Sequence, residues 1–145
     1  MGKPVAGDVV VLPFPQTNLQ PGKRRPALVV AELPGDDLIR CQITTRLHSD
    51  SFAVPLTAAD FVTGRLATDS YARSNRLFTV EASVILYSAG RVTPAKLNEV
   101  KAKLRELFAY LMIAVSVGRA HVDVGGAAAR QRAVRPRRRP SWRII

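Results

Sequence analysis

For most of its length, the chain carries its apolar residues in short runs of strand length, and this pattern restricts the possible folds more than any other feature. Residues 8–12 and 26–31 are such runs, and turn-forming residues follow each of them. The uninterrupted apolar run 26–31 is expected to be buried on both faces. Short, β-branched runs bounded by proline, glycine and aspartate are typical of strands. The chain is therefore expected to be mainly β, with an antiparallel sheet that curves into a small barrel.

The remaining expected strands are less uniform. In residues 38–44, Ile39, Cys41 and Ile43 alternate with polar residues, which predicts a strand with one buried and one polar face and places Cys41 in the core. Residues 13–24 contain three prolines and are predicted to form a long loop. Further short strands are predicted at residues 52–56, 70–80 and 83–87.

One long helix is expected near the end of the chain. Thr93 is a suitable N-cap, and Pro94 then occupies the first helical position. Apolar residues recur at intervals of three and four, at Leu97, Val100, Leu104, Leu107, Leu111 and Val115. We expect this helix to end at Gly118, and residues 57–60 to form a single helical turn. The helix is apolar over more than one stripe between residues 107 and 117, which favours packing against a partner.

The net charge of +11 is unevenly distributed along the 145 residues. Residues 1–118 contain 14 basic and 10 acidic residues, whereas residues 119–145 contain 8 and 1. The end of the chain is arginine-rich and of low complexity, a composition that is typical of disorder. We therefore expect a folded domain at 1–118 and a disordered basic tail at 119–145. The net charge predicts a polyanionic partner, but most of the excess lies in the tail, so the charge of the whole chain does not indicate what the folded domain binds.

Export and membrane insertion have no support in the sequence. The longest apolar stretch, residues 107–117, is about half of the roughly 20 residues that a membrane-spanning helix needs. The first residues lack the apolar region and cleavage site of a signal peptide. The single cysteine, Cys41, cannot form an internal disulfide. A cytoplasmic protein is expected.

The predicted hairpin of residues 26–31 and 38–44 brings together residues with catalytic potential. Its turn is centred near Gly35, so Arg25 faces residues 44–46 across the open end. The Arg25 guanidinium then lies beside the Thr44 hydroxyl, and Gln42 shares the face of Thr44. Positive charge is supplied by Lys23, Arg24, Arg25 and Arg46. This end of the hairpin is a credible pocket for a phosphodiester.

The same residues can also be explained by their structural roles alone, without a catalytic function. Basic residues before a strand are usually solvated, and threonine is common in strands because it is β-branched. His48, in the loop after Thr44, is a candidate general base, although histidines in surface loops are usually bystanders. The carboxylates show no metal-ligand spacing, so neither a metal nor another cofactor is predicted.

Five segments, taken together, carry a resemblance to a known family. They are GDVVVLPFP (7–15), KRRPALVV (23–30), CQITT (41–45), DSYARSNRLFTVE (69–81) and GRVTPAKLNEV (90–100). In this order and spacing the chain resembles the MazF/PemK toxins of type II toxin-antitoxin systems. The resemblance implies an SH3-like barrel and a homodimer that is inhibited by an acidic antitoxin. It also implies a metal-independent endoribonuclease that cleaves single-stranded RNA at a short specific sequence.

The resemblance also implies roles for individual residues. Arg25 and Thr44 match the catalytic arginine and threonine of the family, which leave a 2′,3′-cyclic phosphate and a 5′-hydroxyl. The remaining expected RNA-binding residues are Lys23, Arg24, Gln42, Arg46 and Arg76. Arg76 stands where many relatives have glutamine, so the family's substrate readout is not carried over to that position. The group that removes the 2′ proton is not identified.

Two other functions are compatible with the same sequence. The last five residues, SWRII, resemble the Trp-x-Ile ending with which the CcdB toxins, of related fold, act on DNA gyrase. The chain would then be a non-enzymatic toxin. A catalytically silent RNA-binding module with the same fold is the second alternative. The presence of both Arg25 and Thr44 favours the enzyme, because a binding module does not need that pair.

Overall fold

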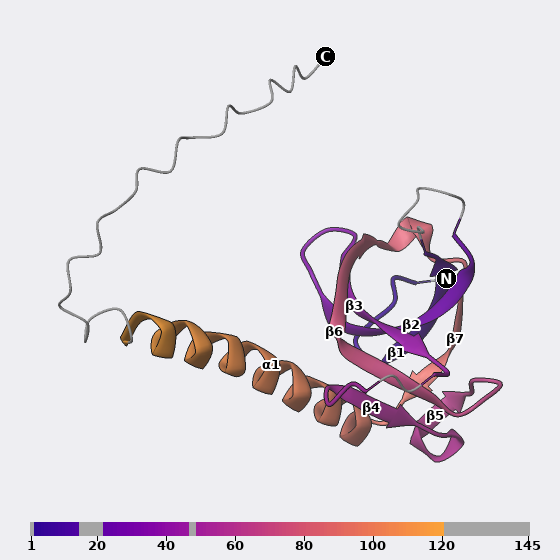
Figure 1. Ribbon diagram of the computed structural model, residues 1–145. Helices are drawn as coiled ribbons and strands as arrows, with labels where there is room; N and C mark the ends of the chain where they lie inside the picture. Colours follow the sequence, from indigo (N-terminus) through magenta and orange to yellow (C-terminus); the bar gives the residue numbers. More distant parts are fainter. Residues whose placement is uncertain (1, 15–21, 47–48, 121–145) are drawn as a thin grey trace.

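The computed structural model describes residues 2–14, 22–46 and 49–120, and its strands form one antiparallel sheet. The seven strands are β1 (Asp8–Pro13), β2 (Arg24–Glu32), β3 (Asp37–Thr44), β4 (Ala53–Leu56), β5 (Phe61–Gly64), β6 (Ser70–Glu81) and β7 (Tyr87–Val92). Their order in the sheet is β4-β6-β3-β2-β1-β7-β5. The sheet curves strongly, as Figure 1 shows, and the expected mainly β, barrel-like fold is confirmed.

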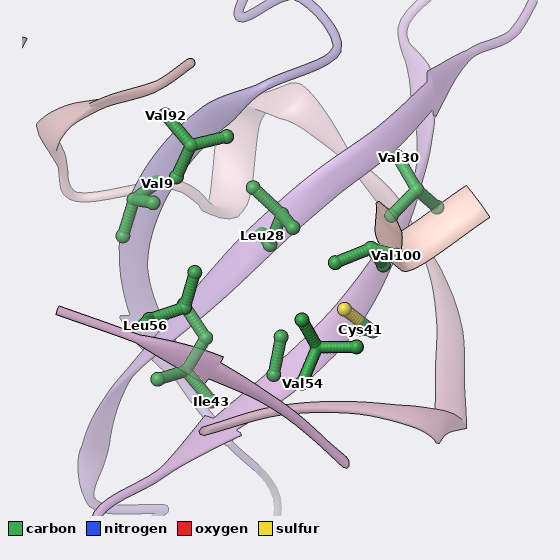
Figure 2. Close-up of a cluster of buried hydrophobic side chains, with 10 residues drawn as sticks. Val9, Leu28, Val30, Cys41, Ile43, Val54, Leu56, Val92 and Val100 are labelled. Carbon is green, nitrogen blue, oxygen red and sulfur yellow. The ribbon is translucent and has the colours of Figure 1, made fainter. Parts of the chain in front are cut away.

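Strand β2 occupies the centre of the sheet and is buried on both faces, as its uninterrupted apolar sequence predicts. Leu28 and Val30 belong to a first core cluster, which also contains Cys41 (Figure 2). Ala27 and Val29 point the other way, into a second cluster. Because side chains alternate along a strand, both clusters depend on the same short run of residues.

One residue on the polar face predicted for β3, Arg40, is buried. Arg40 is only 4% exposed, and its guanidinium carbon lies 4.4 Å from the centroid of Phe14 and 5.2 Å from that of Phe78. The two rings meet edge to face, and cation–π attraction offsets part of the cost of burying the charge. Burial lowers the pKa of Arg40 to about 10, so the side chain remains charged at neutral pH.

The predicted strand at residues 83–87 is wrong for most of its length. Ala82–Val84 form a short 3-10 helix, η2, and β7 begins at Tyr87. Strand β5 was not predicted, because it is a short edge strand that is largely exposed and lacks an alternating pattern. Gly64 in β5 has a φ of +67° and approaches β7 so closely that a Cβ atom would lie 2.1 Å from the carbonyl oxygen of Ala89.

The two predicted helical segments are confirmed. Residues Ala58–Asp60 form a 3-10 helix, η1, whose capping box joins Thr57 and Asp60. The long helix α1 (Pro94–Ala120) begins where expected, since the Thr93 hydroxyl accepts a hydrogen bond of 3.2 Å from the Lys96 amide. It runs two residues past the expected end at Gly118.

The first part of α1 packs against the sheet. Val100 is fully buried, and Leu97 and Leu104 pack against the first core cluster. Farther along, α1 extends away from the barrel (Figure 1), and Phe108 is 55% exposed. Within residues 2–14, 22–46 and 49–120, no helix is long and apolar enough to cross a membrane. Residues 121–145, which contain most of the predicted tail, lie outside the described residues.

Candidate active site

The register of β2 and β3 brings Arg25 and Thr44 together. Ala27 faces Gln42 in this hairpin, and the same register, continued by two residues toward its open end, places Arg25 opposite Thr44. Both side chains line one hollow of about 510 Å³, here called the hairpin hollow. Its lining residues are Lys23, Arg25, Pro26, Ile43, Thr44, Thr45, Arg46 and Ser70. The sequence-based juxtaposition of Arg25 and Thr44 is therefore present in the fold.

The electrostatics of the hairpin hollow favour an anion. Three of its lining residues, Lys23, Arg25 and Arg46, are exposed cations, and no carboxylate lines it among the described residues. The Thr44 hydroxyl oxygen accepts a hydrogen bond of 3.2 Å from the backbone N–H of Arg46. This contact occupies an acceptor position of Thr44 and leaves the hydroxyl proton free to be donated to an anionic ligand.

The other predicted RNA-binding residues are not all in the hairpin hollow. Arg24 lines a second hollow of about 600 Å³, here called the rim hollow. Neighbouring strand residues point to opposite faces, which separates Arg24 from Arg25. Gln42 is partly buried on β3, where it pairs with Ala27 on one side and Arg73 on the other.

The pairing of β3 with β6 contains an irregularity that local sequence patterns do not indicate. Cys41 faces Leu77, whereas the next residue, Gln42, faces Arg73. Residues 74–76 of β6 therefore have no partner in this ladder. Arg76 lies in this irregular segment, exposed, and does not line the hairpin hollow.

A buried carboxylate holds this irregular segment, and the sequence analysis did not identify it. Asp50 accepts hydrogen bonds from Arg73 Nε at 3.0 Å, Asn75 Nδ2 at 3.1 Å and the Phe52 amide at 3.0 Å. Its side chain is only 5% exposed. No short-range signal marks Asp50 as the anchor of β6, because its two side-chain partners, Arg73 and Asn75, lie more than twenty residues away along the chain.

A comparison with protein families gives one match over most of the chain. The model of the PemK-like, MazF-like toxins of type II toxin-antitoxin systems matches residues 6–108. The chain belongs to this family. A comparison with curated proteins gives no significant match.

Solved structures agree with this MazF-like toxin fold. MazF (Form-I) of Deinococcus radiodurans has a TM-score of 0.61 and 25% identity, covering 75% of this chain and 99% of that one. MazE-MazF (Form-III) of the same organism has a TM-score of 0.60 and 26% identity, covering 74% and 98%. An endoribonuclease from a mycobacterial species has a TM-score of 0.57 and 20% identity, covering 75% and 94%.

The remaining candidate functional residues of this MazF-like toxin either lie in the core or are outside the described residues. Burial raises the pKa of the Cys41 thiol to about 12, so Cys41 is a core residue and not a nucleophile. In the part of the chain that is described, no group of three or more His, Cys, Asp or Glu side chains is placed to hold a metal ion. His48 and the terminal Trp142 and Ile145 lie outside the described residues.

Proposed function

We propose that this MazF-like toxin cleaves single-stranded RNA within a short specific sequence, without a metal ion, and that Arg25 and Thr44 are its catalytic residues. The observation that supports this proposal most is that both side chains line one cationic hollow from facing strands. A module that only binds RNA needs the positive charge but not a hydroxyl beside a guanidinium. The enzyme is therefore preferred over the silent binding module.

In the proposed reaction, the 2′-hydroxyl of the substrate attacks the adjacent phosphorus and the 5′-oxygen of the next nucleotide leaves. The 2′-hydroxyl loses its proton, and the leaving oxygen gains one, so the products are a 2′,3′-cyclic phosphate and a 5′-hydroxyl. Arg25 provides a guanidinium, whose planar set of donors stabilises the charge that develops on the pentacoordinate phosphate. The Thr44 hydroxyl, already positioned by the Arg46 amide, donates to a phosphate oxygen. His48 is the candidate acceptor of the 2′ proton.

We further propose that Lys23, Arg24 and Arg46 contact phosphates, and that Gln42 and Arg76 contact bases. Lys23 and Arg46 line the hairpin hollow beside Arg25, where they hold the phosphates next to the scissile one. Phosphate contacts give affinity without sequence information, whereas contacts to base edges give specificity. The cleaved sequence therefore depends on Gln42 and Arg76 and not on the residues that contact phosphates.

The proposed partners are a second copy of the chain and an acidic antitoxin. Phe108 of α1 is 55% exposed, and the sequence that follows it is apolar. An exposed aromatic side chain next to an apolar segment favours dimerisation. The related MazF of Deinococcus radiodurans has been crystallised with MazE. An acidic segment of an antitoxin would bind in the hairpin hollow, where it meets three cations.

The experiment that tests this function is sequencing of the 5′-hydroxyl RNA ends produced by the purified protein. The wild type is expected to produce ends that share a short motif. The matched control is the double variant Arg25→Ala, Thr44→Ala, which keeps the other cations of the hollow. If the wild type produces no more such ends than this control, the enzymatic function is wrong, and the two non-enzymatic alternatives remain. Light scattering on the same sample tests the dimer, since a monomeric mass at micromolar concentration would contradict it.

A further inference from the structure

The rim hollow, where Arg24 lies, has no role in the cleavage step described above. It adjoins the hairpin hollow, because Pro26, Thr45 and Ser70 line both. Its other lining residues are Val11, Arg24, Arg65, Leu66, Ala67, Thr68, Tyr87, Ser88 and Ala89. We propose that the rim hollow binds the RNA nucleotide that flanks the cleaved segment, with Arg24 and Arg65 on phosphates and Tyr87 stacked on the base. This inference rests on the proposed function, and it adds a subsite to it.

The two arginines make the rim hollow a site for anions. Arg24 is the first residue of β2, and Arg65 follows the end of β5 directly. Both are exposed, and neither forms an ion pair with another described residue. No carboxylate is among the described residues that line this hollow. Two uncompensated guanidinium groups in one concave surface favour a phosphate-bearing ligand.

The exposed ring of Tyr87 favours a nucleotide over a simple anion as the ligand of the rim hollow. It is the first residue of β7, pairs with Val11 of β1, and is 48% exposed although it is a large aromatic residue. Single-stranded nucleic acids are bound by exposed aromatic rings beside cationic grooves, because every base can stack on such a ring. The hydroxyl groups of Thr68 and Ser88 add hydrogen-bonding partners for the sugar and base.

The geometry of β2 connects this hollow to the catalytic one. Arg24 and Arg25 are consecutive residues of an extended strand, and their side chains therefore point to opposite sides. Each lines a different hollow, and Pro26 of the same strand lies on the boundary between them. An RNA strand that crosses this boundary contacts Arg25 with one phosphate and Arg24 with a neighbouring phosphate. The scissile and flanking nucleotides are thereby held by adjacent residues.

The test compares RNA oligonucleotides that contain only the cleaved motif with ones extended at the 5′ or the 3′ side. Each carries a 2′-deoxy nucleotide at the cleavage position, so binding is measured by fluorescence anisotropy without cleavage. The wild type is expected to bind an extension on one side at least about fivefold more tightly than the minimal RNA. Arg24→Ala, Arg65→Ala and Tyr87→Ala are each expected to abolish this preference. The matched control is Arg105→Ala, since Arg105 is exposed on α1 and lines neither hollow.

Two further readouts separate the roles of the side chains. Loss of one phosphate contact lowers the slope of log affinity against log salt by about 0.7 for single strands. Arg24→Ala and Arg65→Ala are expected to show this reduction, whereas Tyr87→Ala is not. Tyr87→Phe is expected to retain the preference for extended RNA, because the phenyl ring still stacks.

The possible outcomes distinguish this inference from the proposed function. If the wild type prefers no extension, or if Arg105→Ala removes the preference as strongly as the other variants, the subsite is wrong even when cleavage occurs. If the rim-hollow variants change the mass in light scattering and not the length preference, a second copy of the chain occupies the hollow and the subsite is again wrong. Failure of the proposed function would appear separately, as an absence of 5′-hydroxyl ends with unmodified RNA.

Discussion

Asp50 accepts a hydrogen bond of 3.0 Å from Arg73 Nε, and this pair holds the part of β6 that lies beside Gln42. The Asp50 side chain is 5% exposed and that of Arg73 is 17% exposed. The same carboxylate also binds Asn75 and the Phe52 amide, so it anchors two segments that follow the hairpin in sequence. This anchor determines where the irregular residues 74–76 lie relative to β3.

Replacement of Asp50 by alanine is expected to destabilise the fold by about 3 kcal/mol, because it leaves a largely buried guanidinium without its partner. Urea denaturation measures this change. Asp69→Ala is the matched control, since Asp69 is exposed and forms no ion pair with a described residue, and a change within about 0.5 kcal/mol is expected there. Equal effects of the two substitutions would show that Asp50 is not an anchor.

Arg25→Ala and Thr44→Ala are each expected to reduce cleavage by at least about a hundredfold, the scale of losing one preorganised donor in a transition state. Arg25 is exposed and Thr44 is only partly buried, so neither substitution should unfold the protein. RNA affinity is expected to remain largely intact, because Lys23 and Arg46 still contact phosphates. Single-turnover kinetics and anisotropy separate the two quantities.

Two further substitutions refine the active-site assignment. Arg25→Lys keeps the charge but lacks the planar set of donors, so it should restore binding better than cleavage. His48→Ala should reduce cleavage strongly if His48 is the base, and hardly at all if it is a bystander. A folded Arg25→Ala protein that cleaves at the wild-type rate would remove Arg25 from the mechanism.

Cleavage is expected to continue in excess EDTA. The proposed mechanism uses the 2′-hydroxyl as an internal nucleophile and a guanidinium for charge, and it therefore needs no bound cation. Nucleases that use two metal ions depend on acidic ligands that are held together. Initial rates with and without EDTA should agree within about twofold. Loss of activity on chelation, with recovery on addition of magnesium, would contradict this mechanism.

Removal of residues 119–145 is expected to weaken RNA binding and its salt dependence while the cleaved motif stays the same. This segment contributes 8 basic residues and 1 acidic residue, and such charge acts through counterion release, which carries no sequence information. Sequencing of 5′-hydroxyl ends from the truncated and full-length proteins checks the motif. A changed motif would show that the tail takes part in sequence recognition. The truncation also removes Trp142 and Ile145, on which the gyrase alternative depends.

The buried thiol of Cys41 is expected to make stability depend on alkaline pH. Cys41 ionises near pH 9 when unfolded but only near pH 12 when folded, because burial disfavours the thiolate. The stabilising contribution is therefore complete below pH 9 and is lost as the pH rises from about 9 toward 12. Between pH 8 and pH 10, the free energy of unfolding should fall more for the wild type than for Cys41→Ala. An equal fall in the free energy of unfolding for the two proteins would contradict this assignment.

Local patterns in the sequence predicted the main β-strands, the burial of β2 on both faces and the start of α1 at Thr93. Each of these depends on residues within a few positions of one another, such as the Thr93 side chain and the Lys96 amide. The position of the turn near Gly35 was sufficient to place Arg25 opposite residues 44–46, because the register of a hairpin follows from its turn. The pairing with Thr44 itself also depends on a shift of one residue in the register between Val29 and Ala31, which the turn does not predict. Much of the candidate site could therefore be predicted.

These short-range relationships and the family resemblance could be read from the sequence. The cover of Phe14 and Phe78 over Arg40 and the contact of Asp50 with Arg73 became known from the folded structure alone. These contacts join residues that are far apart along the chain, and they depend on how β6 pairs with β3. That pairing contains unmatched residues, which no periodic pattern records, because a periodic pattern reflects burial along one strand and carries no information about the register of its neighbour.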